Sequence, residues 1–239
     1  RFKDGGRLFY VGSGTSGRLG VLDAAECPPT YSTDPEMVQG IIAGGYDALV
    51  RSIEGAEDYP EDGAHAVSDH NITANDTVLG ITASSSTPFV LGTLEQAKEI
   101  GALTGLIICN KPPQLKYVDH MISLIVGPEV ITGSTRMKAG TATKLVLNMI
   151  TTTLMIKLNK TYGNLMVDLK ASNKKLWDRG TRIISHLTRL DYDDSLQLLQ
   201  SAKGEVKIAI VMNKTNCVYD VGVQLLKNVR GSLTKALSE

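Results

Sequence analysis

Apolar runs of four to seven residues recur through the first two thirds of the chain, and stretches with helical spacing separate them. Runs with so little polar alternation are typical of strands covered on both faces of a parallel sheet. Strands are predicted at 8–11, 38–43, 77–82, 103–109 and 121–126. Helices are predicted at 16–25, at 47–67 with an interruption near Pro60, and at 88–100. This alternation predicts an α/β fold built on a doubly wound parallel sheet.

The pattern changes after residue 141. Residues 141–158 are apolar nearly all round a helix, which predicts burial in the core or in a subunit interface. Beyond Gly163 only helices are predicted, at 165–189, 193–202, 204–212 and 216–229. We therefore expect a sheet-containing domain over 1–189 and a small all-helical appendage over 190–239.

Composition excludes several classes of protein. The 239 residues carry 25 Lys and Arg against 25 Asp and Glu, and this balance argues against nucleic acid as a partner. No run reaches the roughly 18 apolar residues of a membrane span, and no signal peptide opens the chain, so no membrane partner is expected. Cys27, Cys109 and Cys217 lie far apart, as reduced thiols of a cytoplasmic protein do. The four histidines have no ligand spacing, so no metal site is expected.

The first candidate motif runs from Gly12 to Gly17 as Gly-Ser-Gly-Thr-Ser-Gly, between a predicted strand and helix. Its glycine spacing raises the possibility of a dinucleotide site, but the second strand ends in Ala43 and two glycines without the acidic residue that holds a ribose. Backbone N–H groups with the hydroxyls of Ser13, Thr15 and Ser16 suit a phosphate group instead. The alternative is a tight turn in which Thr15 or Ser16 caps the helix.

A second hydroxyl-rich loop, from Thr82 to Pro88, also follows a strand and precedes a helix, and it contains Ser84, Ser85 and Thr87. It is either a polar helix cap or part of a ligand site. Ligands of such sheets bind at the carboxyl ends of the strands, so the two loops together predict a phosphomonoester held without metal. Arg18 or Lys138 is a candidate for added positive charge.

Two glutamates are candidates for proton transfer. Glu26 stands just before Cys27 and two prolines, where its helix is expected to end. Glu57 lies in a later acidic segment, and a pair of carboxyl groups can divide the roles of acid and base. The spacing leaves open whether they meet, and a lone glutamate is more often a surface charge. The polar stretch 127–141 before the apolar helix is either functional or a helix cap.

Four segments resemble one family. VGSGTSGRLGVLDAAECPPT (11–30) and GPEVITGSTRMKAGTATKLVLNM (127–149) resemble the two signatures of the bacterial N-acetylmuramic acid 6-phosphate etherases, the second of which is shared with glucokinase regulatory protein. IAGGYDALVRSIEGAED (42–58) and YGNLMVDLKASNKKL (162–176) are also similar to etherase segments. The resemblance runs from about residue 5 to 189, and the AECPPT and EGAED segments favour the etherases over the regulatory relative.

The resemblance implies a sugar isomerase (SIS) domain over 1–189, a homodimer with active sites near the subunit interface, and no metal or organic cofactor. The implied cytoplasmic reaction, part of peptidoglycan recycling, splits a D-lactyl ether into N-acetylglucosamine 6-phosphate and D-lactate. By motif position Glu26 is the acid/base glutamate and Glu57 the second one, and Ser16, Ser84 and Thr87 contact phosphate. Ser85 replaces a glycine of the family's loop, and the helical segment that precedes the first strand in the family is missing here.

We expect a mechanism of elimination followed by hydration. An opened sugar acidifies the C2 proton, lactate leaves C3 once protonated, and water then adds at C3; Glu26 is expected to protonate lactate and Glu57 to activate water. The alternatives are an aldose–ketose phosphosugar isomerase, a non-catalytic phosphosugar sensor, and the nucleotide-binding protein disfavoured above.

Overall fold

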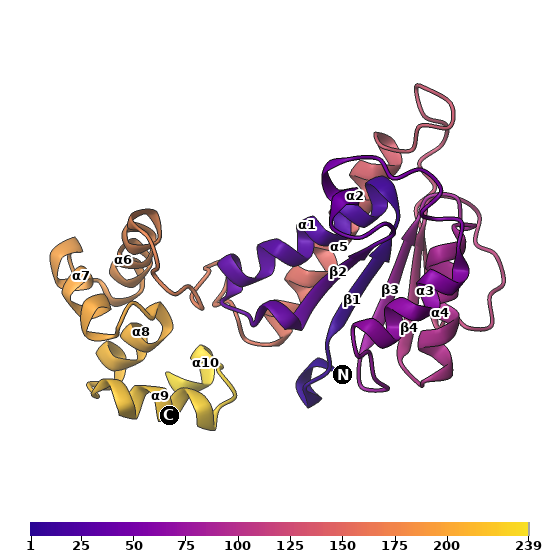
Figure 1. The fold of residues 1–239 in the computed structure, drawn as a ribbon. Coiled ribbons are helices and arrows are strands. Elements are labelled where there is room, and N and C mark those ends of the chain that lie inside the picture. Colours follow the sequence, from indigo (N-terminus) through magenta and orange to yellow (C-terminus); the bar gives the residue numbers. More distant parts are fainter. Residues whose placement is uncertain (239) are drawn as a thin grey trace. The chain divides into compact units, whose positions relative to one another are not determined.

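The sheet is the frame of the first part of the chain. The computed structural model describes residues 1–238, and its strands are β1 (Leu8–Gly12), β2 (Val38–Ile42), β3 (Thr77–Thr82), β4 (Leu103–Ile108) and β5 (His120–Ser123). All pairs are parallel and the order is β2-β1-β3-β4-β5 (Figure 1). The five predicted strands and the doubly wound α/β class are confirmed. The last strand is the least accurate, since β5 ends at Ser123 rather than at 126.

Helices cover both faces of this sheet. α3 (Pro60–Asp69) and α4 (Pro88–Glu99) lie on one face, where Phe9, Leu94 and Leu106 are fully buried. α1 (Gly14–Tyr31) and α5 (Lys138–Lys157) lie on the other face (Figure 1). α2 (Asp47–Val50) is a single turn, and short 3-10 helices span Phe2–Asp4 and Pro35–Met37. The predicted helix over 47–67 is therefore two helices, and Pro60 opens the second at a position that needs no N–H donor.

The predicted end of the first helix near residue 25 is wrong. α1 continues to Tyr31 and contains both Pro28 and Pro29. The prolines remove two helical N–H donors, but their fixed φ is compatible with a helix. The Ser32 N–H bonds the Pro28 carbonyl at 2.9 Å, and buried Cys27 anchors the last turns, so packing outweighs the local cost. Burial raises the pKa of the Cys27 thiol to about 12.

The chain divides into two compact units. The α/β unit is Arg1–Cys27 with Asp34–Thr151, and the helical unit is Pro28–Thr33 with Thr152–Glu239, of which Glu239 itself lies outside the described residues. The helical unit contains α6 (Lys174–Thr188), α7 (Tyr192–Ser201), α8 (Val206–Thr215), α9 (Tyr219–Asn228) and α10 (Leu233–Ala236).

This division differs from the expected domain boundary at 189. Ile184 of α6 is fully buried in the same core as Leu199 and Val206, so α6 belongs with the helices that follow it. The predicted helix over 165–189 begins only at Lys174, because the Asn173 side chain caps it by accepting from the Leu176 N–H at 3.0 Å.

The apolar helix α5 is only partly buried within one chain. Leu147 and Met155 are fully buried, whereas Leu145 is 52% and Met149 58% exposed. The sequence predicts that this helix is buried in the core or in a subunit interface. The core buries Leu147 and Met155 but leaves Leu145 and Met149 exposed. Within residues 1–238 no helix is long and apolar enough to cross a membrane.

Candidate functional site

The two hydroxyl-rich loops lie at one edge of the sheet. β1 and β3 are adjacent parallel strands, with Gly12 in register with Ile81, and each loop follows the carboxyl end of its strand. The structure thus brings together the loops that the sequence singled out. This edge is where ligands of open α/β sheets bind.

The first loop is a tight turn from β1 into α1. A Cβ at Gly12 would come within 2.6 Å of the Gly17 nitrogen, and a Cβ at Gly17 within 2.6 Å of an Ile42 side-chain carbon, so both positions need glycine. Ser13, Thr15 and Ser16 are partly buried at the start of α1, whose first N–H groups open at this edge. The loop therefore offers hydroxyls and backbone donors to an anion.

The second loop is ordered by its own hydroxyls. Thr82 and Thr87 share a hydrogen bond of 2.7 Å between their hydroxyls, and the exposed Ser84 hydroxyl lies 3.0 Å from that of Ser86. Ser85 has φ of 69°, in the left-handed region. Ser85 stands where the family's loop has a glycine, the residue that adopts positive φ without a Cβ clash. A side chain there costs about 1–2 kcal/mol relative to glycine.

Glu57 connects the two loops. Its carboxylate accepts a hydrogen bond from the Ser13 hydroxyl of the first loop. Its main-chain oxygen accepts from the Phe89 N–H, 3.0 Å away, just beyond the second loop. Glu57 also lines a cavity of about 150 Å³ together with Ser13 and Arg18. An exposed carboxylate beside a loop that offers hydroxyl and N–H donors can act as a base.

Both candidate cations form hydrogen bonds with backbone carbonyls. The Arg18 guanidinium donates to the carbonyl oxygens of Leu49 at 3.1 Å and Arg51 at 3.0 Å, so it fastens the segment that leads to Glu57. The Lys138 ammonium donates to the Pro128 carbonyl at 2.9 Å. Each of these two cations therefore spends hydrogen bonds on backbone carbonyls.

Glu129 caps α5, a role that the sequence did not assign to it within the polar stretch 127–141. Its carboxylate accepts from the N–H groups of Ala139 and Lys138, both at 3.0 Å, and so caps α5 across the polar loop 127–137. These backbone bonds lower the pKa of Glu129 below its usual range. Glu129 and the N–H groups it caps are nine and ten positions apart, and no sequence spacing predicts a contact at that separation.

Glu26 does not join Glu57 within one subunit. It is exposed on α1, twelve residues beyond Gly14, which corresponds to about 18 Å along a helix axis. It lies one helical turn from Leu22, which is 49% exposed. Glu26 is therefore on an outward stripe of α1, far from the first loop of its own chain.

Asp23 holds that helix in place. Its buried carboxylate accepts from the Tyr10 hydroxyl at 2.9 Å, the Asn148 amide at 2.6 Å and the Thr151 hydroxyl at 3.2 Å. These bonds join α1 to β1 and α5. Burial, together with Asp23, raises the pKa of Tyr10 far above its usual value.

A parallel α/β sheet with two hydroxyl-lined strand-to-helix turns at one edge defines a SIS-type protein, and residues 1–98 match the family model "Glucokinase regulatory protein N-terminal SIS domain". The chain is 55% identical over 238 residues to the N-acetylmuramic acid 6-phosphate etherase of Clostridium acetobutylicum, covering 99% of this chain and 79% of the relative. Against the etherase of Rhodopirellula baltica it is 52% identical over 239 residues, covering 100% and 79%. The chain belongs to the N-acetylmuramic acid 6-phosphate etherase family.

Proposed function

We propose that this protein is a cytoplasmic carbon–oxygen lyase that cleaves the D-lactyl ether of N-acetylmuramic acid 6-phosphate, in the recycling of peptidoglycan. Water is consumed, and the products are N-acetylglucosamine 6-phosphate and D-lactate. Relatives that carry the etherase name match nearly the whole chain at 52–55% identity, which supports the proposal. The observation that carries it is Glu57, bonded through its side chain to one hydroxyl loop and through its backbone to the helix after the other.

The phosphate group is assigned to the two loops. Ser13, Thr15 and Ser16 supply hydroxyls at the start of α1, and Ser84, Ser85 and Thr87 supply them from the second loop. Because Arg18 and Lys138 are bonded to backbone carbonyls, hydroxyls and helix N–H groups are the main donors. Lys138 then contributes through its position at the start of α5.

The chemistry follows from the poor leaving ability of an ether. The opened sugar presents an aldehyde that acidifies the C2 proton, and a carboxylate removes it. The C3–oxygen bond breaks as lactate takes up a proton, which leaves a conjugated aldehyde. Water adds to C3 and a proton returns to C2. Glu57 is assigned to activating the water and Glu26 to protonating lactate, each step worth roughly 10²–10⁴-fold.

We further propose a homodimer whose sites combine both subunits. Leu145 and Met149 lie one helical turn apart on α5 and are more than half exposed, and Leu22 is 49% exposed on α1, which Asp23 ties to α5. Large apolar side chains gathered on one face are typical of an interface. Glu26 lies on the same stripe as Leu22, so pairing two such faces carries Glu26 toward the partner's loops.

The test is product analysis in ¹⁸O-water with N-acetylmuramic acid 6-phosphate as substrate. We expect D-lactate without label and N-acetylglucosamine 6-phosphate with one ¹⁸O at C3. A phosphosugar isomerase would release no lactate, and a sensor would bind substrate without turnover; either result overturns the proposal.

Glu26→Gln is expected to abolish lactate release while leaving the fold intact, and undiminished turnover by this variant contradicts the role of Glu26.

A further inference from the structure

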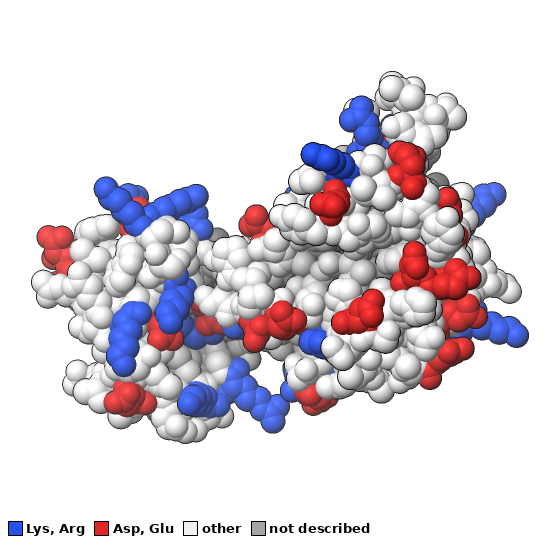
Figure 2. Space-filling model, in the orientation of Figure 1, with Lys and Arg blue, Asp and Glu red and all other residues white. Residues whose placement is uncertain are grey.

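The two units carry opposite charge. In the sequence, residues 152–239 contain fourteen Lys and Arg against eight Asp and Glu, a net charge of +6, and 28–33 add none. The α/β unit contains eleven basic and seventeen acidic residues, a net charge of −6. Basic side chains accordingly crowd the surface of the helical unit in Figure 2. A unit with a net positive charge attracts anions, and a cleft in its surface focuses the electric field.

The helical unit contains such a hollow. A cavity of about 540 Å³ is lined by residues of α8, α9 and the segment 158–170, a volume typical of small-molecule sites. Val167, Leu169, Ile208 and Leu226 supply buried apolar surface to it. Five basic side chains but only two acidic ones complete the lining.

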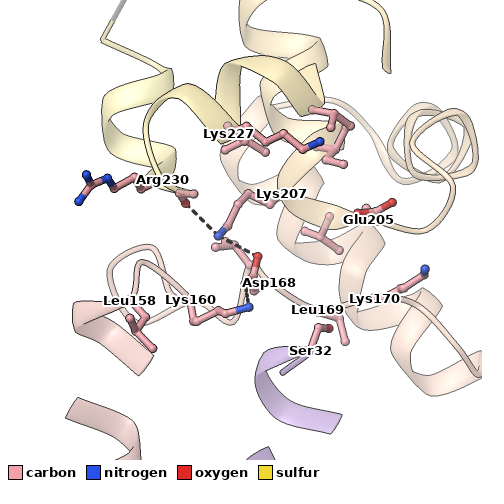
Figure 3. Close-up of a pocket in the computed structure, with 16 residues that line it drawn as sticks. Ser32, Leu158, Lys160, Asp168, Leu169, Lys170, Glu205, Lys207, Lys227 and Arg230 are labelled. Atoms are coloured by element: carbon pink, nitrogen blue, oxygen red, sulfur yellow. Dashed lines mark hydrogen bonds and ion pairs between the residues drawn. The ribbon is translucent and has the colours of Figure 1, made fainter. Parts of the chain in front are cut away.

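Both acidic side chains have partners, and cations neutralise one of them, Asp168. Asp168 pairs with Lys160 at 2.7 Å and with Lys207 at 2.8 Å (Figure 3). Glu205 accepts a hydrogen bond of 2.7 Å from the Tyr219 hydroxyl. The buried Lys207 ammonium also donates to the carbonyls of Asn159 and Gly231, so all three of its protons are used.

Three other basic side chains of the lining have no carboxylate partner within residues 1–238: Lys170, Lys227 and Arg230. Arg230 points away from Lys207 in Figure 3, so the available charge is mainly that of the two exposed lysines. They come from different segments, Lys227 from α9 and Lys170 from the chain before α6. Because both lysines line the cavity, each attracts an anion held inside it.

We propose that this cavity is a second binding site, separate from the hydroxyl loops, for a small organic anion with an apolar body. A bare inorganic anion is not the best ligand, because it cannot cover the apolar lining of the cavity. A ligand with an apolar body can displace water from that lining. The basic rim selects negative charge at the other end of the ligand. The proposal does not depend on the reaction assigned to the α/β unit.

The test uses 8-anilinonaphthalene-1-sulfonate, a fluorescent organic anion with an apolar body, in a titration of the full chain. We expect the double variant Lys170→Gln/Lys227→Gln to raise the dissociation constant about fivefold, the scale of two partly exposed charge contacts. The matched control is Lys174→Gln/Lys214→Gln, which removes two exposed charges of the same unit outside the cavity lining. The control is expected to bind within about twofold of the wild type.

Competition experiments distinguish the contribution of the ligand's apolar body from that of its negative charge. Octanoate is expected to displace the dye from the wild type, and inorganic phosphate at the same ionic strength is expected to displace much less. Equal dye affinity in the cavity variant and the control overturns the proposal, because the dye then binds elsewhere. Displacement by phosphate alone also overturns it, since the apolar lining would then have no role.

Discussion

The Ser13 hydroxyl donates a hydrogen bond to the Glu57 carboxylate, and this bond links the first hydroxyl loop to the acidic loop. A serine hydroxyl carries one proton. If a substrate phosphate accepts that proton instead, the Glu57 carboxylate loses this hydrogen bond and is free to contact the substrate. Binding at the loop and reactivity at Glu57 are therefore coupled through Ser13.

Glu57→Gln tests the assigned base. We expect kcat for formation of N-acetylglucosamine 6-phosphate to fall about 10²–10⁴-fold, because an amide cannot take up a proton from the attacking water, with little change in KM. The matched control is Glu54→Gln, whose carboxylate lines the same cavity and accepts only from the Ser52 hydroxyl, at 2.7 Å, within residues 1–238. Equal losses in the two variants would show that charge in the cavity, rather than Glu57 itself, supports turnover.

Arg18→Ala tests whether the guanidinium positions the acidic loop. Without its bonds to the Leu49 and Arg51 carbonyls, the segment carrying Glu57 loses two charge-assisted contacts, and we expect kcat to fall about tenfold, equivalent to one such bond. Inorganic phosphate, used as a competitive inhibitor, is expected to keep its inhibition constant. A large rise in that constant would instead make Arg18 a direct phosphate ligand.

The sheet and its ligand edge were predictable because apolar runs such as Leu8–Val11 and Leu103–Cys109 are long and bounded by clear turn residues. The hydroxyl loops were predictable for the same reason, since each directly follows such a run. The length of α1 was not. Local sequence argues that a helix stops before two prolines, and only the buried contacts of Asp23 and Cys27 carry it on to Tyr31.

The relation of the two glutamates depends on that same helix. A helix ending near Glu26 leaves its carboxylate free to turn toward the loops, whereas the continuous helix fixes it on an outward stripe. The partners of Glu57 were equally hidden, because Ser13 and Phe89 are 44 and 32 positions away from it. Contacts between loops at such separations follow from the folded sheet, which no periodicity encodes.

Ser85→Gly tests the strain in the second loop. Glycine adopts φ of 69° without the Cβ clash, and its greater freedom in the unfolded chain offsets part of the gain, so we expect stability to rise by about 0.5–1 kcal/mol. Urea unfolding measures this directly. Ser86→Gly is the control: Ser86 has no positive φ, so the same change there is expected to be destabilising. A loss of stability in Ser85→Gly would mean that the serine side chain contributes more than the strain costs.

Asp119 makes stability depend on pH at the outer edge of the sheet. The Lys98 ammonium and the Thr104 N–H lower the pKa of Asp119 to about 2. Since an unfolded aspartate titrates near pH 3.9, this stabilisation is complete above about pH 4 and is lost as the pH falls toward 2. Asp119→Asn is expected to cost about 1 kcal/mol or less at pH 7, because solvent screens the pair.

Urea unfolding at pH 7, 4 and 3 checks the Asp119 prediction, and the variant is expected to lose less stability than the wild type between pH 4 and 3. Asp69→Asn is the control, because Asp69 is exposed and forms no ion pair within residues 1–238. Parallel pH curves for wild type and Asp119→Asn would exclude Asp119 as a source of the acid sensitivity.

Mixing two inactive variants tests whether each site draws on both subunits. Glu26→Gln and Glu57→Gln are each expected to be inactive alone. In a mixed dimer, one site combines the intact Glu57 of one chain with the intact Glu26 of the other, while the second site has neither. Random pairing gives half mixed dimers with one working site each, so co-expression is expected to restore about a quarter of wild-type activity. If both glutamates came from one chain, every site would lack one of them, and the mixture would be as inactive as its components.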